Sequence, residues 1–327
     1  MEVASRTHTN VPLSRLIEAH NISDLASLLR TGQCPQVRAP GEPLVRPVEQ
    51  GDREEVCRLL AEGYPTRTIP WGRLFDHPWQ PEATPRGFVL TAAGEIVGFI
   101  GTIGAMRSLR GRRGVVCNLT SWFVRPAYRG SSMALIAAAT GLENTTYTSL
   151  SAGEQRTRPI LKALGFSEFD RTKLLLPPLL NVSTLLAPRP SMVFGDDVRP
   201  LVTGEHRQIL DDHAGCDCLP VLLMDEGKSC LIIAQRRRRH RGNRDTKMLA
   251  YSEILYCSSP PLLRRHLERV KLALMRRQRT LGLGVFQRFV PDVWSPFRRS
   301  TGTLFRSARF VANEFDELYS ELPLLGL

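Results

Sequence analysis

The stretch Trp122-Phe-Val-Arg-Pro-Ala-Tyr-Arg-Gly-Ser-Ser-Met-Ala-Leu-Ile136 decides how the first half of this 327-residue chain folds. Its first residues are typical of a strand, Pro126 ends that strand, and a helix is predicted to begin at Ser131 or Ser132. The turn residues are small, so successive backbone N–H groups can converge on one anion. The helix start adds unpaired donors and a positive dipole end, and Arg129 adds a charged donor. This stretch therefore predicts a site that suits a pyrophosphate.

The flanking segments indicate the fold class. A first strand near residues 44–48 and a helix that Asp52 and Glu55 open as a capping box precede three strands at 88–91, 96–105 and 115–124. Beyond the quoted stretch, the pattern predicts a strand at 147–150, a helix near 156–164 and a strand at 166–174. An antiparallel meander followed by alternating strands and helices predicts an α+β fold, with a mixed, mostly antiparallel sheet flanked by helices.

Two motifs resemble a known family. Arg129-Gly-Ser-Ser-Met-Ala134 resembles the Arg/Gln-x-x-Gly-x-Gly/Ala signature of the GNAT acetyltransferase superfamily, with Ser132 in place of the first signature glycine. Ile160-Leu-Lys-Ala-Leu-Gly-Phe166 resembles the family's helix that ends in Leu-Gly-Phe before the last strand. The resemblance covers residues 44–173. It implies a sheet that splays between its fourth and fifth strands, with acetyl-CoA or another acyl-CoA in that cleft.

The resemblance also implies which residues bind this co-substrate. The pantetheine would pair with the backbone of the fourth strand, and backbone N–H groups of the turn would hold the pyrophosphate. The positions so assigned are Trp122, Phe123, Val124, Arg129, Gly130, Ser131, Ser132, Met133 and Ala134. The implied reaction is transfer of an acetyl or acyl group to an amine, and less readily to a hydroxyl.

The chain departs from the family at the catalytic positions. Leu161 stands where the family often has a tyrosine that reprotonates the thiolate, and residues 115–124 contain no carboxylate to act as a base. Glu154 and Ser121 are the catalytic candidates, with Cys117 nearby. Glu154 would relay a proton from the amine through water, or it is a solvated carboxylate at a helix start. These departures keep a second hypothesis open, a CoA-binding scaffold without catalysis.

The remaining segments complete the predicted organisation. Residues 1–43 form an extension, 44–173 the acyltransferase domain, 174–200 a linker and 201–327 a diverged GNAT-like second half that repeats the meander, helix and strand. The second half would complete the acceptor pocket or be a degenerate twin. Aromatic residues in segment 63–85 line an acceptor pocket or form a lid on the core; they are Tyr64, Trp71, Phe75 and Trp79.

Charge favours an anionic ligand. The formal net charge is +12, of which residues 44–173 carry +5 and residues 174–327 carry +7, so there is no basic tail. The run of arginines at 236–239 is interpreted as an extended hairpin turn. A nucleic-acid-associated protein remains an alternative function, but this run lacks the aromatic residues that stack on bases.

Cysteine content and hydropathy bear on location and metals. Seven scattered cysteines favour reduced thiols in a cytoplasm over a disulfide framework. Cys216 and Cys218 lie near His213, but the spacing is not that of a metal site, and no metal is predicted. The first residues do not form a signal peptide, and no apolar run is long enough for a membrane span. By analogy with bacterial tandem acyltransferases, the acceptor would be a small molecule, a sugar, a peptide or a cell-surface precursor.

Overall fold

The computed structural model describes residues 42–65, 68–109, 111–150, 157–179, 189–239, 249–311 and 314–326. The chain divides into two compact units. The first holds the described residues to Asp76, Gln80–Arg107 and Gly114–Tyr147, and the second holds His77–Trp79, Ser108–Arg113 and Thr148–Leu327. These units are defined by packing, whereas the limits 44–173 and 201–327 come from sequence and stay a prediction.

The strands of the first unit follow one another in the sheet. They are β1 (Leu44–Pro47), β2 (Gly87–Ala92), β3 (Glu95–Leu109), β4 (Arg112–Val124) and β5 (Thr145–Ser149), neighbours in that order. β1 and β3 both pair with β2 in the antiparallel sense. Ala93 and Gly94 connect β2 to β3, and both have positive φ, 49° and 86°. A two-residue turn of that kind matches the twist of paired strands, which explains the tight hairpin predicted here.

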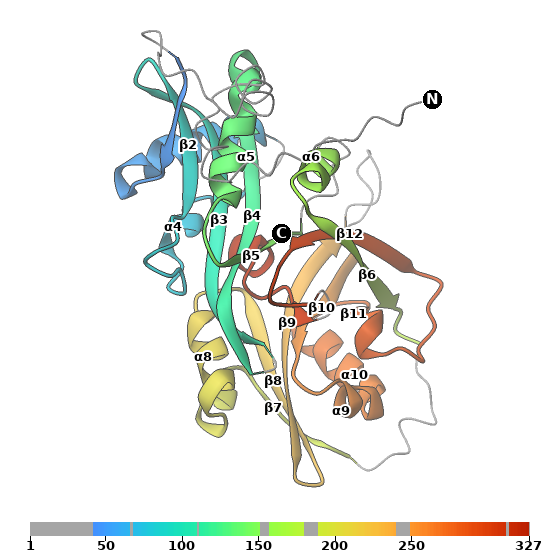
Figure 1. The fold of residues 1–327 in the computed structure, drawn as a ribbon. Coiled ribbons are helices and arrows are strands. Elements are labelled where there is room, and N and C mark those ends of the chain that lie inside the picture. The colour runs from blue at the N-terminus through green and yellow to red at the C-terminus, as the bar shows by residue number, and fades with distance from the viewer. Residues whose placement is uncertain are drawn as a thin grey trace, which may run out of the picture. The chain divides into compact units, whose positions relative to one another are not determined.

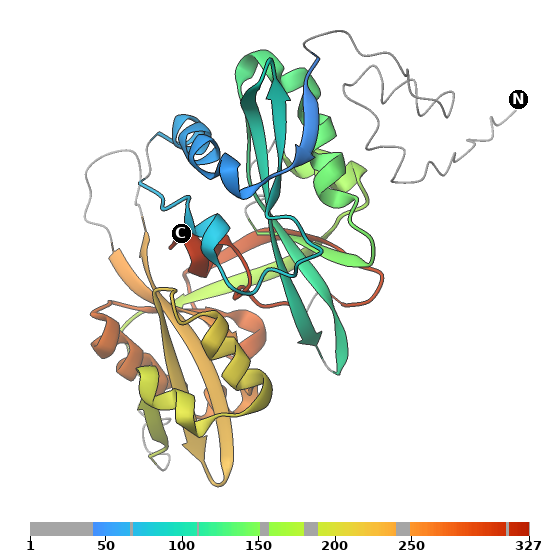
Figure 2. The same cartoon turned by 90° about the vertical axis from the view of Figure 1, so that its left-hand side faces the viewer.

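Helices cover both faces of this sheet (Figure 2). α3 (Arg53–Gly63) lies on the face of Phe123, because a Cβ at Gly63 would meet that ring at 2.6 Å. α5 (Ser132–Thr140) lies on the opposite face, where Gly98 is in contact with Leu135 of the helix. Every residue from Ala134 to Thr140 is buried, because α5 is apolar on all sides. A short α4 (Arg73–Asp76) completes the unit.

The predicted capping box at the start of α3 is wrong. The side chain of Asp52 does not cap α3. It accepts the N–H of Glu49 at 2.8 Å, within the short helix η1 (Gln50–Asp52), and binds the guanidinium of Arg46 at 2.6 Å. Glu55 instead accepts the N–H of Ile96 at 2.7 Å and joins α3 to β3. Asp52 therefore forms a capping box with Glu49 in η1, and Glu55 makes a tertiary contact, in place of the box between Asp52 and Glu55 that the spacing indicated.

The second unit has seven strands in the order β12-β6-β11-β10-β9-β8-β7. Their bounds are β6 (Ser167–Leu176), β7 (Ser191–Phe194), β8 (Cys218–Asp225), β9 (Lys228–Arg239), β10 (Leu249–Cys257), β11 (Leu283–Phe286) and β12 (Arg298–Arg306). Its helices are α6 (Thr157–Ala163), α8 (Gly204–Asp212), α9 (Pro260–Arg265), α10 (Leu267–Gln278) and α11 (Glu321–Leu325), with 3-10 turns η3 (Gly195–Leu201) and η4 (Gln287–Phe289). Figure 1 shows α8 on one side of β8 and β9, and α9 and α10 on the other.

The predicted internal duplication is confirmed in this topology. Strands β7 to β10 form an antiparallel meander, α9 and α10 cross over, and β11 returns parallel to β10. The first unit has the same sequence of a meander, one helix and a fifth strand. Three strands depart from the predicted plan, and the first, β7, lies within the predicted linker 174–200. β6 pairs with β11, with Leu174 opposite Val285, and β12, which the sequence did not indicate, pairs with the other edge of β6.

The first arginines of the run predicted as an extended hairpin turn continue a strand, and residues 240–248, with Gly242 and Asn243, lie outside the described residues. β9 extends through Arg239, whereas the predicted strand ended at Gln235. Residues on β9 alternate between the two faces. Ile232 and Ala234 therefore pack with α9 and α10, and Arg237 points to the other face and is buried. Arg236 is exposed.

Among the described helices, none is long and apolar enough to cross a membrane.

Candidate functional site

The β4–α5 connection has the predicted strand–turn–helix order. β4 ends at Val124 and α5 begins at Ser132, both as predicted. A six-residue 3-10 helix, η2 (Pro126–Ser131), occupies the turn between them. Pro126 fits its first position because proline has no N–H to satisfy and its φ is already helical. Tyr128 N–H donates to the carbonyl of Arg125 at 2.9 Å and starts this turn.

The turn is less open than the predicted phosphate cradle. A 3-10 helix directs each N–H to the carbonyl three residues earlier, so several of its amides already have backbone acceptors. The N–H of Ser132 donates to the carbonyl of Arg129, and the Ser132 hydroxyl donates to that same oxygen at 2.7 Å. The donors that remain for an anion lie in the first turn of α5, at Met133 and Ala134, because the side chain of Ser131 does not cap them.

The residues of the turn are nevertheless exposed enough to contact a ligand. Arg129 and Gly130 are exposed, whereas Ser131, Ser132 and Met133 are half-buried. The guanidinium of Arg129 is therefore accessible at the positive end of a buried nine-residue helix. Ala134 is buried and lacks a bulky side chain, so only its backbone is offered at this position.

Ser121 distorts β4 just before the predicted pantetheine segment. Its φ is 54°, a left-handed conformation that a residue with a Cβ adopts rarely. The burial pattern changes at the same point: Ser121, Trp122 and Phe123 are half-buried in succession, whereas residues 116–120 are buried. The positive φ of Ser121 shows that the backbone is turned at this point. Such outliers cluster at functional sites, and this one was not readable from the sequence.

The aromatic segment before β2 packs onto the protein. The rings of Tyr64 and Trp71 are 5.4 Å apart, and Tyr64 lies 6.4 Å from Phe123. The Tyr64 hydroxyl donates to the carbonyl of Trp122 at 3.4 Å. Trp71 and Phe75 are buried. These contacts agree with the lid interpretation of segment 63–85, and Tyr64 directs its hydroxyl at the predicted site.

The catalytic candidates lie in surroundings that differ from one residue to the next. Ser121 lies at the distortion in β4, with its hydroxyl 3.2 Å from that of Thr120. Glu154 lies outside the described residues. Cys117 is buried, and burial raises the pKa of its thiol well above the usual range, so it is neutral and a poor base. Leu161 is buried in α6, at the position where the resemblance implied a tyrosine.

The second unit does not repeat the phosphate cradle. At the corresponding place β10 ends at Cys257 and α9 begins with Pro260 and Pro261. Neither proline has an N–H, so two of the donors at the helix start are missing. The hydroxyl of Ser258 is engaged as well, because it accepts the N–H of Leu231 at 2.8 Å.

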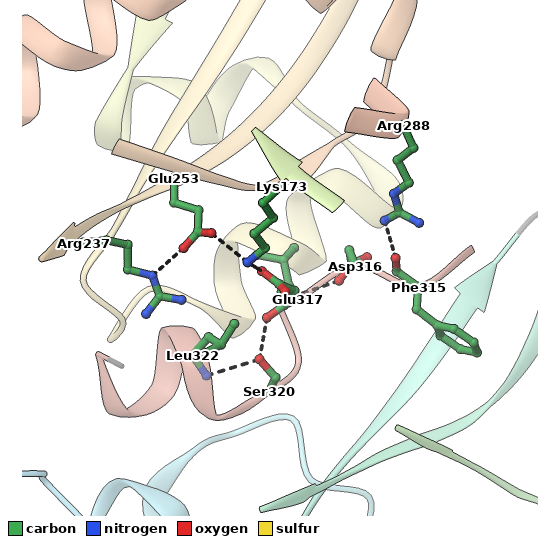
Figure 3. Close-up of polar contacts among 10 residues, drawn as sticks. Lys173, Arg237, Glu253, Arg288, Phe315, Asp316, Glu317, Ser320 and Leu322 are labelled. Atoms are coloured by element: carbon green, nitrogen blue, oxygen red, sulfur yellow. Dashed lines mark hydrogen bonds and ion pairs between the residues drawn. The ribbon is translucent and has the colours of Figure 1, made fainter. Parts of the chain in front are cut away.

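A buried charge cluster lies in the second unit instead (Figure 3). Lys173 Nζ on β6 is 2.7 Å from Glu253 Oε1 on β10 and 2.6 Å from Glu317 Oε2 of the C-terminal segment. Arg237 Nε on β9 binds the other oxygen of Glu253 at 2.7 Å. Two cations thus face two anions. Burial alone would raise the pKa of Glu253, but the charges of Lys173 and Arg237 outweigh it and lower that pKa to about 2.

Sequence reasoning missed this cluster because its members are far apart along the chain. The one available signal was the alternation within the arginine run, which places Arg237 on the inner face if the strand continues. Glu253 stays ionised at neutral pH and is held by two cations, so it is a structural group and a poor proton acceptor.

No metal site is present among the residues that the structure describes. The two ring nitrogens of His213 lie 2.9 Å from the carbonyls of Ile209 and Leu318, and its ring stacks on Trp79 at 4.7 Å. Cys216 and Cys218 are thiols without a disulfide. His213 is therefore part of the packing around the C-terminal segment.

Comparison with known proteins identifies the fold. The structure is similar to a GCN5-related N-acetyltransferase from Anabaena variabilis ATCC 29413, with TM-score 0.51 and 12% identity over 81% of this chain and 72% of that chain. A probable N-acyltransferase from Enterococcus faecalis V583 gives TM-score 0.51 and 11% identity over 81% and 72%. A GCN5-related N-acetyltransferase from Kribbella flavida gives 0.50 and 11% over 82% and 71%. No family model and no curated protein matches the sequence. The chain has the GNAT fold, α+β, with a diverged second half.

Proposed function

We propose that this protein is an acyltransferase that moves an acetyl or longer acyl group from acyl-CoA to an amine, and less readily to a hydroxyl. The acceptor would be a small molecule, a sugar, a peptide or a cell-surface precursor. The observation that carries the proposal is the β4–α5 connection, where an exposed arginine and the first turn of a buried helix follow a strand distorted at Ser121. The GNAT fold supports acyl transfer, and the resemblance of Arg129–Ala134 to the signature motif of that superfamily implies CoA at this connection.

Each part of the connection has a proposed role. Arg129 and the first-turn amides of α5 at Met133 and Ala134 bind the pyrophosphate, and Gly130, Ser131 and Ser132 form the turn that leads to them. The backbone of Trp122, Phe123 and Val124 pairs with the pantetheine. The turned backbone at Ser121 presents an N–H to the thioester carbonyl and stabilises the negative charge that develops there.

The chemistry follows from these positions. The amine nitrogen attacks the thioester carbon, a tetrahedral intermediate forms, and the C–S bond breaks to release CoA as thiolate. A proton leaves the amine through water, with Glu154 or the Ser121 hydroxyl as the proposed relay, and a proton returns to the thiolate. Because an amine positioned near a thioester needs little beyond deprotonation and proximity, positioning supplies most of the acceleration. One CoA binds per chain in this proposal, since Pro260 and Pro261 weaken the second cradle.

One observation favours a second candidate, a CoA-binding scaffold without catalysis. Leu161 is apolar and buried at the position where a proton donor for the thiolate is expected. Nucleic-acid binding through the arginine run is less favoured, because Arg237 is buried in an ion pair. A cytoplasmic location remains part of the proposal, supported by the six free thiols among the described residues.

The test measures binding and turnover together. Purified protein is mixed with acetyl-CoA and with longer acyl-CoAs, the shift in melting temperature is recorded, and thiol release is followed with a panel of amines. Arg129→Glu should weaken acyl-CoA binding by about a hundredfold or more, because a charged contact is replaced by repulsion. Arg58→Glu, at an exposed site on α3, is the charge-matched control. Unchanged affinity in the Arg129 variant contradicts the site, and stabilisation without thiol release supports the scaffold.

A further inference from the structure

A basic groove opens at one end of the second unit, away from the connection between β10 and α9. It is lined by residues 217–219 at the start of β8, by Arg236 near the end of β9 and by residues 277–279 at the end of α10. Its volume is about 700 Å³. Pockets that bind small molecules are typically of this size.

The charge of the groove is not balanced by the protein. Arg236, Arg277 and Arg279 face it, and Asp217 is the only acidic residue among the described residues that line it, which leaves these residues with a formal charge of +2. None of the three arginines forms an ion pair among the described residues. Three guanidinium groups gathered in one groove repel one another, and an anion with several oxygens relieves that repulsion while accepting their planar donors.

Two features hold these arginines in place before any ligand arrives. The guanidinium of Arg277 lies over the ring of Phe194, 4.2 Å from its centroid, which restricts its orientation. Arg279 has φ 52° and ψ 58° at the end of α10, where its N–H donates to the carbonyl of Met275. Glycine is the usual residue in this left-handed position, because a Cβ is strained there. Residues with a Cβ in strained backbone conformations cluster at functional sites, so a functional role is expected for the side chain of Arg279.

Gln278 adds a neutral polar group to the same wall. Its Oε1 is buried and has no hydrogen-bond partner within the described protein. A buried acceptor without a partner is unfavourable, so a ligand that carries a hydroxyl or amino donor would satisfy it.

The attraction of cations to a helix C-terminus explains only part of this arrangement. It accounts for basic residues in the last turn of α10. It does not account for Arg236, which comes from a strand, or for the left-handed backbone of Arg279. The buried Arg237 separates Arg236 from the rest of the arginine run, and the groove has no aromatic lining, so an extended nucleic acid is not the expected occupant.

We propose that this groove binds a small phosphorylated molecule. Its phosphate oxygens accept from Arg236, Arg277 and Arg279, and a hydroxyl or amine next to the phosphate donates to Gln278 Oε1. The site is independent of the acyl-CoA site proposed in the first unit.

The test uses the full chain with Arg129→Glu, so that pyrophosphate does not bind at the first unit. Calorimetric titration with inorganic pyrophosphate and with glucose 6-phosphate should show saturable binding of one ligand per chain. The double substitution Arg236→Gln, Arg277→Gln should weaken both ligands by about tenfold or more, because charged hydrogen bonds are lost. Arg276→Gln, an exposed arginine on the same helix that does not line the groove, is the matched control and should bind as its parent does.

Further arms of the experiment separate the alternatives. Gln278→Leu should weaken glucose 6-phosphate more than pyrophosphate, since only the sugar carries hydroxyl donors. Equal binding of sulfate at the same ionic strength would overturn the proposal, as would pyrophosphate binding that the double variant leaves unchanged. A single-stranded oligonucleotide that binds through the groove when neither phosphate ligand saturates it would also overturn it.

Discussion

Replacing Glu253 by glutamine tests how much the buried charge cluster stabilises the second unit. Glutamine has nearly the same shape, so the change removes charge without opening a cavity. The carboxylate binds Lys173 at 2.7 Å and Arg237 at 2.7 Å, and its side chain is 5% exposed. Glutamine keeps one acceptor oxygen and places an NH2 donor at the other position, so either Arg237 or Lys173 faces a donor where it had a carboxylate oxygen, and neither keeps the negative charge of residue 253.

The magnitude follows from the ionisation of this group. The pKa of Glu253 is lowered from 4.5 to about 2, a difference worth about 3 kcal/mol of stability at neutral pH. In measured cases, removing one partner of a buried ion pair lowers the free energy of unfolding by ~3–5 kcal/mol, which agrees with the value for Glu253. For a unit of this size that amounts to a fall in melting temperature of about 6–12 °C.

The pH dependence has a definite sign. A carboxylate whose folded pKa lies below its unfolded pKa stabilises the fold above the unfolded value, and this contribution is lost as pH falls from 4.5 toward 2. Calorimetric scans should therefore show a large gap between wild type and Glu253→Gln at pH 7 that narrows by pH 3. Glu226→Gln, which breaks only an exposed pair with Arg265, is the control and should melt like wild type. A melting temperature within 2 °C of wild type for Glu253→Gln at pH 7, or a gap at pH 3 as wide as the gap at pH 7, refutes the reasoning.

Three other expectations follow from single residues. Ser121→Val should lower the melting temperature by several degrees, because a β-branched residue is strained at φ 54°. Ser121→Gly should not lower it. An equal fall in melting temperature for both variants would show that the hydroxyl matters and the backbone conformation does not. Burial lowers the pKa of His213, so the unfolded chain takes up the proton more readily and the stability of the fold should decline as pH falls below 6.5. His213→Gln should make the melting temperature depend less on pH in this range. An unchanged pH dependence of the melting temperature would contradict this expectation. The neutral, buried Cys117 thiol should resist iodoacetamide in the native protein, and Cys117→Ala should retain thiol-release activity; rapid native alkylation would argue against its burial.

Most features that were predicted correctly from the sequence depend on interactions between neighbouring residues. The hairpin at Ala93 and Gly94 and the start of α5 at Ser132 were predictable because turns, strand ends and helix starts depend on residues that are neighbours along the chain. The duplicated order of meander, helix and strand was predictable for the same reason, since hydrophobic periodicity repeats in both halves.

Contacts between distant residues decided the rest. Glu55 fits a capping box with Asp52 by spacing, yet in the fold it accepts the N–H of Ile96, a residue on β3. The αL conformation of Ser121 and the 3-10 turn before α5 depend on packing around β4, which no local pattern encodes.

The sequence by itself determined the α+β order of elements and the place of the β4–α5 connection, because both depend on short-range periodicity and turn chemistry. Only the tertiary structure decided that β6 pairs with β11, that Lys173 meets Glu253 and Glu317, and that the arginines of β9 and α10 share a groove. The physical reason is that strand pairing and charge burial are set by which surfaces are removed from water together, and residues more than a hundred positions apart contribute to the same surface.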